Sequence, residues 1–192
     1  MTARTHDLAA FTALAIVVVL HPLHEITLST LLVALLANQI GGIAPDIDQP
    51  TAPFWRNLPV GKFFGKFVDK LLGGHRFLSH SLLGLVLFAY LAKLLLVLLH
   101  PLMARVDTQL VWEAFIVGML SHLVMDSFTK EGVPWLLPIP FKFGFPPLKT
   151  LRITTGKFSE HFVIFPVLLI ITIWICSTHY QNIVTYLHQL HR

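Results

Sequence analysis

Histidine and aspartate residues gather in three short clusters, each beside a long apolar segment. The clusters are residues 45–48 (PDID), 75–81 (HRFLSHS) and 122–126 (HLVMD). Such side chains are costly at the edge of a bilayer unless they bind one another or a ligand. Imidazole and carboxylate groups together suit Zn²⁺, and also Mn²⁺ or Fe²⁺. The clusters therefore predict a site for a divalent metal, with zinc as the expected ion.

The spacing within the clusters shows how they could bind an ion. His122 and Asp126 are four residues apart, so on a helix they share one face and can bind the same ion. The alternative is a helix-end aspartate hydrogen-bonded to a histidine. Asp46 and Asp48 point the same way if their segment is extended, whereas a turn with a helix-capping aspartate is an equal alternative.

The spacing of His75 and His80 does not suit one face of a single helix. The glycines at 73–74 place His75 in a turn and His80 in the following helix, and the alternative is an interfacial polar belt. Arg76 could steady a phosphate oxygen, or be an ordinary snorkelling cation. Glu160 could be a further ligand or a catalytic base, or only a first-turn acid favoured by the helix dipole.

The composition is that of a membrane protein. The 192 residues suggest a single domain, residues 1–192, and 55% of them are hydrophobic with a mean hydropathy of +0.71. Only 12% are charged, about half the usual fraction of a soluble domain. The net charge of +4 favours basic loops beside anionic lipid over a nucleic-acid partner. The single cysteine, Cys176, excludes an intrachain disulfide and a Cys-rich zinc cage.

Five apolar spans predict the fold. They cover residues 8–23, 26–44, 77–99, 109–128 and 162–179. Crossing a bilayer takes about 20 helical residues, and the backbone must satisfy its own hydrogen bonds there. A tight turn at 21–25 would join the first two spans into a hairpin. We therefore expect an all-α membrane protein, a bundle of about five transmembrane helices.

Two longer connections carry further elements. In residues 62–72, phenylalanines and lysines separate onto two faces at helical spacing, which predicts an amphipathic helix in the membrane interface, ended by the glycines at 73–74. Residues 129–158 contain five prolines, so a long helix is excluded there. We expect an irregular or short-stranded, Pro-rich cytoplasmic lid.

The basic residues orient the bundle. Apart from Lys93 within a span, only Arg105 and Arg192 fall on the side opposite the N-terminus. Basic loops face the cytoplasm, which predicts that the N-terminal side of the bundle lies inside. The candidate ligands fall at span ends on that side, where a bundle can bring them together. They are His6, Asp46, Asp48, His75, His80, His122 and Asp126.

In this order the clusters resemble the YdjM family, described as membrane-bound metal-dependent hydrolases. The family pattern has an early His, then Pro-Asp-x-Asp, His-Arg-x-x-Thr-His-Ser, His-x-x-x-Asp-x-x-Thr-x-x-Gly-Val and a Thr-Gly…Glu segment. Here these are His6, 45–48, 75–81, 122–133 and 155–160. Two positions depart from the pattern. Gln49 stands where the family often has a histidine, and Ser79 replaces a threonine but keeps the hydroxyl.

The resemblance implies a hydrolase of the bacterial inner (plasma) membrane, with its site facing the cytoplasm. The His-x-x-x-Asp pattern is also distantly similar to zinc-dependent phospholipases C, which implies two or three metal ions and a phosphoester substrate. We expect the partners to be membrane lipid and an amphipathic, phosphate-bearing substrate, with Glu160 and Arg76 as catalytic groups; the oligomeric state is not predicted. A haem- or metal-binding protein without hydrolase activity, or an ion transporter, are the alternatives.

Overall fold

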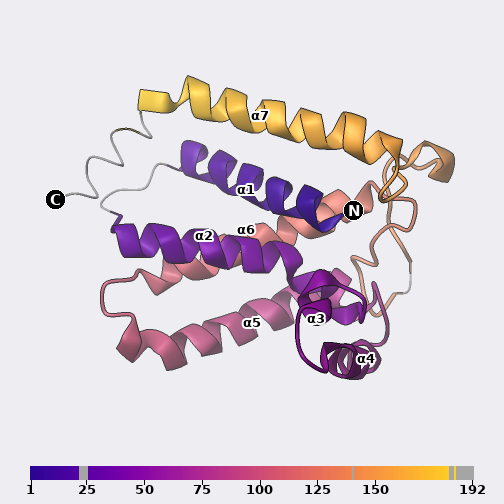
Figure 1. The fold of residues 1–192 in the computed structure, drawn as a ribbon, viewed down its shortest axis with the longest axis horizontal. Helices are drawn as coiled ribbons and strands as arrows, with labels where there is room; N and C mark the ends of the chain where they lie inside the picture. Colours follow the sequence, from indigo (N-terminus) through magenta and orange to yellow (C-terminus); the bar gives the residue numbers. More distant parts are fainter. Residues whose placement is uncertain (22–25, 140, 182–183, 185–192) are drawn as a thin grey trace.

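The computed structural model describes residues 1–21, 26–139, 141–181 and 184 (Figure 1). Five long helices dominate these ranges, and no strand occurs in them. They are α1 (Ala3–Leu20), α2 (Leu28–Ile43), α5 (Leu82–Leu99), α6 (Thr108–Ser127) and α7 (Phe165–Thr178). With the short turns that extend three of them, all five are long and apolar enough to cross a membrane. The predicted all-α, five-span fold is confirmed, whereas the predicted turn at 21–25 lies largely outside the described residues.

Short helices fill the connections. A 3₁₀ helix, η1 (Ala44–Asp48), extends α2, and α3 (Pro53–Arg56) and α4 (Gly61–Leu71) follow it. Further short helices are η2 (Leu78–His80), η3 (His100–Leu102), η4 (Lys149–Leu151) and η5 (Glu160–Ile164), the last a π-helical turn that leads into α7. The amphipathic helix predicted at 62–72 is therefore present as α4. Gly73 and Gly74 follow it with φ of +81° and +96°, as expected at a helix end.

Helix α6 forms the centre of the bundle and packs along α1, α2 and α5. The buried residues of this helix include Val111, Phe115, Met119 and Leu123, and the apolar core is built around them. The opposite surfaces of the outer helices are apolar and exposed. On α2, for example, Leu32, Leu36 and Ile40 recur every fourth residue and point outward. A helix with apolar residues on its outer face is suited to lipid rather than to water.

Glycine allows α2 and α6 to approach at backbone distance. A Cβ added at Gly118 would lie 2.0 Å from the carbonyl oxygen of Asn38, and one at Gly41 would lie 2.1 Å from that of Phe115. Asn38 also donates a hydrogen bond of 3.1 Å to the carbonyl of Ala114 across the same contact. Close helix contacts through small residues are typical of membrane bundles. This contact sets the distance between the ends of α2 and α6.

We expect Gly118→Val to destabilise the bundle, because the added side chain meets backbone atoms that cannot turn away. The free energy of unfolding should fall by at least about 1–3 kcal/mol, measured by thermal denaturation in detergent. Leu120→Val, on the exposed face of the same helix, is the matched control and should denature near the temperature of the unmodified protein. Equal stability of the two variants would contradict the close α2–α6 contact.

Two local predictions were wrong. Helix α1 begins at Ala3, so His6 lies inside it rather than before it. His80 lies in η2 rather than in α5, because the hydroxyl of Ser81 accepts a hydrogen bond from the amide of Gly84 and caps the helix there. Of the two alternatives for the segment with Asp46 and Asp48, the extended one does not occur, since α2 continues through Pro45 as the 3₁₀ helix η1.

Residues 129–158 are irregular, as their prolines predict. Isolated bridges pair Thr129 with Ile153 and Val133 with Phe143. Arg152 donates hydrogen bonds to the carbonyls of Pro146 and Pro147, which holds the end of the segment together. That this segment forms a lid, and that it and α4 lie in the membrane interface, stay predictions.

Candidate metal centre

One end of the bundle collects the titratable side chains. The N-terminal ends of α1, α5 and α7 lie at this end, together with the C-terminal ends of α2 and α6 (Figure 1). Among the described residues, three overlapping groups of histidine and carboxylate atoms have spacings suited to a metal ion, each within 4.8 Å. They are His6–Asp46–His122, His80–His122–Asp126 and Asp46–Asp48–His75. The predicted ligands therefore come together, although they span from the first helix to the fourth long one.

The distances at the centre resemble those of a coordination shell. His80 Nε2 lies 3.7 Å from Asp46 Oδ1 and 3.6 Å from Asp126 Oδ2. His122 Nε2 lies 3.6 Å and 3.8 Å from the same two atoms. The ligands of a tetrahedral zinc, at about 2.1 Å from the ion, are about 3.4 Å from one another. These spacings are too long for hydrogen bonds but suit atoms that share a cation.

Several atoms that face this centre have no hydrogen-bond partner. Among the described residues they include Nδ1 and Nε2 of His6 and Nε2 of His80 and His122. All three side chains are at most 1% exposed. Buried polar atoms are almost always hydrogen-bonded, and a group of exceptions requires an explanation. A divalent cation fits this donor set, because neutral imidazole nitrogens and carboxylate oxygens are its usual ligands.

The backbone of α2 fixes how His122 presents its ring. Nδ1 of His122 lies 2.6 Å from the carbonyl oxygen of Gly42, so Nδ1 must carry the proton and Nε2 is left with a free lone pair. The ring of His6 stacks on that of His122 with centroids 3.6 Å apart. Hydrogen bonds of this kind hold metal-binding histidines in one tautomer and orientation. The close α2–α6 contact therefore also prepares His122 for an ion.

Asp46 and Asp48 differ in their surroundings, although the sequence pattern predicted the same role, metal ligand, for both. Asp48 is fully buried and accepts hydrogen bonds from His75 Nδ1 (2.7 Å), the Arg76 amide (2.9 Å) and the Ser79 hydroxyl. Asp46 instead approaches the free nitrogens of the central histidines. Asp48 is thus bonded to the loop of residues 75–80 and Asp46 faces the central histidines, and both belong to candidate groups.

The negative charge of this centre acts on His80. Burial by itself lowers the pKa of this histidine, but the nearby carboxylates of Asp46, Asp48 and Asp126 outweigh burial and raise the pKa. Aspartates that favour a proton on His80 equally favour a divalent cation beside it. The electrostatics therefore agree with the donor set.

Arg76 is buried at the same centre rather than exposed. Its guanidinium lies 2.6 Å from Asp126 Oδ2 and donates a 2.8 Å hydrogen bond to the Thr129 hydroxyl, with Glu131 3.5 Å away. Its backbone has φ of +59°, a left-handed conformation that costs a non-glycine residue about 1–2 kcal/mol. Strained residues of this kind cluster at functional sites. Asp126 also contacts the Met1 nitrogen at 2.5 Å.

Glu160 lies beside the centre and belongs to none of the three groups. Its carboxylate accepts hydrogen bonds from the amide and hydroxyl of Thr2, the hydroxyl of Thr5 and the amide of Gly156, at 2.6–2.8 Å. These bonds join the start of α1 to the turn before α7. They favour a role in holding His6 in place, and the role of Glu160 as a ligand or base stays a prediction.

Other contacts at the centre were missed from the sequence. The Gly42 carbonyl has no side-chain signal, because any residue would supply it. Thr129 stands at the threonine of the family pattern but was given no role, and Glu131 lies in an exposed loop that carries no such signal. Only the fold brings these groups to Arg76 and His122.

Comparison with known proteins gives a consistent family. A family model described as YdjM inner membrane protein matches residues 1–184. The chain is 26% identical over 128 residues to the uncharacterized protein YvsG of Bacillus subtilis, covering 67% of this chain and 69% of that protein. It is 30% identical over 126 residues to inner membrane protein YdjM of Escherichia coli, covering 63% and 56% of the two chains. Inner membrane protein YbcI of the same organism is 29% identical over 129 residues, 66% of each chain. No solved structure matches. With a family match that covers nearly the whole chain, and with five apolar helices, this protein belongs to the YdjM family of inner membrane proteins.

Proposed function

We propose that this protein is a membrane-embedded, metal-dependent hydrolase that cleaves phosphoester bonds of lipids or similar amphipathic molecules. One observation carries the proposal: buried imidazole nitrogens from separate helices lack hydrogen-bond partners and face a common centre together with the carboxylates of Asp46 and Asp126. Such an arrangement costs stability unless a ligand compensates for it. Binding of divalent ions is the function that explains the cost.

Each group near the centre has a role in this proposal. His6, His80, His122, Asp46 and Asp126 would hold the ions. A bound divalent cation supplies nucleophilic water at neutral pH and a Lewis acid for a phosphoryl oxygen. Other groups would act by positioning these ligands. Asp48 would orient His75 and His80, and the Gly42 carbonyl would fix the tautomer of His122.

The surroundings of the centre favour an anionic amphipathic substrate. Lys62, Lys66 and Lys70 are exposed on α4, and Phe63 and Phe67 are exposed on the same helix. Basic side chains attract phosphate, while exposed phenylalanines favour the lipid interface. The excess of basic residues at this end of the bundle places it on the cytoplasmic side in our proposal.

The proposal is tested by hydrolysis in reconstituted membranes. Protein loaded with Zn²⁺ or Mn²⁺ should release phosphate or a head group from phosphatidic acid, phosphatidylglycerol or an isoprenyl phosphate, and a chelator should abolish the release. Asp126→Asn should lower the rate by at least about 100-fold, because it removes a charge that faces the ions. Glu113→Gln removes a carboxylate from the opposite end of α6 and is the matched control, expected to retain full activity. Absence of release from every substrate class would overturn the proposal.

A further inference from the structure

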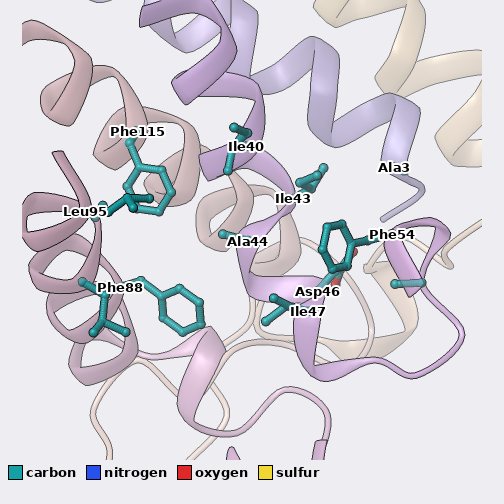
Figure 2. Close-up of a pocket in the computed structure, with 13 residues that line it drawn as sticks. Ala3, Ile40, Ile43, Ala44, Asp46, Ile47, Phe54, Phe88, Leu95 and Phe115 are labelled. Atoms are coloured by element: carbon teal, nitrogen blue, oxygen red, sulfur yellow. The ribbon is translucent and has the colours of Figure 1, made fainter. Parts of the chain in front are cut away.

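A cavity of about 350 Å³ opens between α2, α5 and α6 on the side of the bundle next to α3. Figure 2 shows Asp46 and Phe54 at one end of it, and Leu95 and Phe115 at the other. Among the described residues that line it, Asp46 carries the only polar side chain. An apolar cavity with a single polar group at one end is shaped for a ligand with a hydrocarbon part and a polar head.

The polar end of the cavity is the candidate metal centre itself. Asp46 lines the cavity and also belongs to the centre. Its Oδ1 lies 3.7 Å from Nε2 of His80 and 3.6 Å from Nε2 of His122. A phosphate held at the centre would therefore have its substituent directed along an apolar wall. No water-filled route is needed for that substituent.

The cavity is open toward lipid. Ile40, Leu91 and Leu95 line it and are 55%, 50% and 54% exposed, and all three lie on helices long enough to span the membrane. Phe115, at the far end, is about three turns of α6 from Asp126, which corresponds to about 16 Å. One leaflet of a bilayer core is about 15 Å thick. The cavity therefore extends over the depth that one lipid chain occupies.

We propose that this cavity holds one hydrocarbon chain of a phosphate-bearing lipid that enters sideways from the leaflet, with its phosphate at the metal centre. The inference rests on the proposed function and names the substrate class. The helix of a second protein is too large an occupant, because a single helical turn about 10 Å across and 5.4 Å high fills about 400 Å³. The volume suits one flexible chain instead.

Photocrosslinking tests where the chain lies without relying on hydrolysis. Vesicles containing the full-length protein and a phosphatidic acid with a diazirine in the middle of one chain are irradiated, and adducts are mapped by mass spectrometry. We expect adducts on the peptides that carry Leu91, Leu95 and Phe115. Leu95→Trp should lower the adduct yield about tenfold, the loss expected from displacing about two methylene groups.

Leu94→Trp is the matched control, because Leu94 is exposed on the same helix but does not line the cavity. It should crosslink like the unmodified protein, and thermal denaturation should show that both variants fold. Leu91→Trp gives a second blocked variant. Equal yields from Leu94→Trp and Leu95→Trp, or adducts spread evenly over the outer helices, would overturn the inference.

The crosslinking result and the hydrolysis result can be told apart. Adducts that Leu95→Trp removes, in protein that hydrolyses nothing, would support the cavity and contradict the hydrolase. Hydrolysis with no adduct in the cavity would support the hydrolase and contradict the chain site. If both hold, Leu95→Trp should also lower the ratio of kcat/KM for long-chain over short-chain esters about tenfold.

Discussion

Replacing His122 with alanine is expected to reduce the divalent metal bound to the purified protein from at least one equivalent to a trace. His122 belongs to two of the three candidate groups, and its Nε2 lies within 3.8 Å of both Asp46 and Asp126. Loss of a partner that only orients a ligand costs about 10–100-fold in metal affinity, and loss of the ligand itself should cost more. Elemental analysis of protein purified from metal-supplemented cells measures the stoichiometry directly.

His100→Ala is the matched control for this experiment. His100 is an exposed histidine in η3, at the opposite end of α5 from the candidate centre. The control variant should retain the metal content of the unmodified protein, and Asp126→Asn should lose it as His122→Ala does. Retention of metal in His122→Ala, or absence of metal from the unmodified protein, would contradict a metal centre at this place.

The second large effect is expected at Arg76. Arg76→Lys should lower kcat/KM by about 10²–10³, the cost of removing one positioned donor from a site that stabilises developing charge. Lysine keeps the positive charge but cannot contact Asp126 and Thr129 at once with a planar group, as the guanidinium does. The measurement is steady-state hydrolysis of a lipid phosphate on which the unmodified protein proves active, together with metal content to separate catalysis from metal loss.

Two further variants separate the guanidinium from its backbone. Glycine accepts φ of +59° without strain, whereas alanine does not. Arg76→Gly and Arg76→Ala should therefore be equally inactive, while Arg76→Gly is the more stable by about 1 kcal/mol. Arg56→Lys, at an exposed arginine in α3, should keep full activity. Full activity of Arg76→Lys would show that only charge is needed at this position.

The positions of the spans and the side on which the polar groups gather follow from the sequence. Apolar length alone identifies a membrane helix, because the bilayer sets that length. The i, i+4 spacing of His122 and Asp126 also predicts correctly that they share a helix face, since the two residues lie on one regular helix. Both predictions depend on local pattern, which is why they could be made without the fold.

The division of labour between the aspartates could not be predicted in that way. It depends on η1 turning Asp46 toward one set of partners and Asp48 toward another, which an extended segment, one of the two alternatives, would not have done. Likewise the left-handed backbone of Arg76 is set by contacts with Asp48 and Asp126, residues far away in the chain. Tertiary contacts decide such features, and no local pattern records them.

The hydrogen bonds of Glu160 have a consequence for biogenesis. They connect Thr5, near the beginning of the polypeptide, to a residue 155 positions later. A ribosome delivers His6 with the first helix but Glu160 only as the last one enters the bilayer. A nascent chain that has inserted four helices therefore lacks the carboxylate that bonds Thr2 and Thr5, so the start of α1 gains these hydrogen bonds only once synthesis has reached α7.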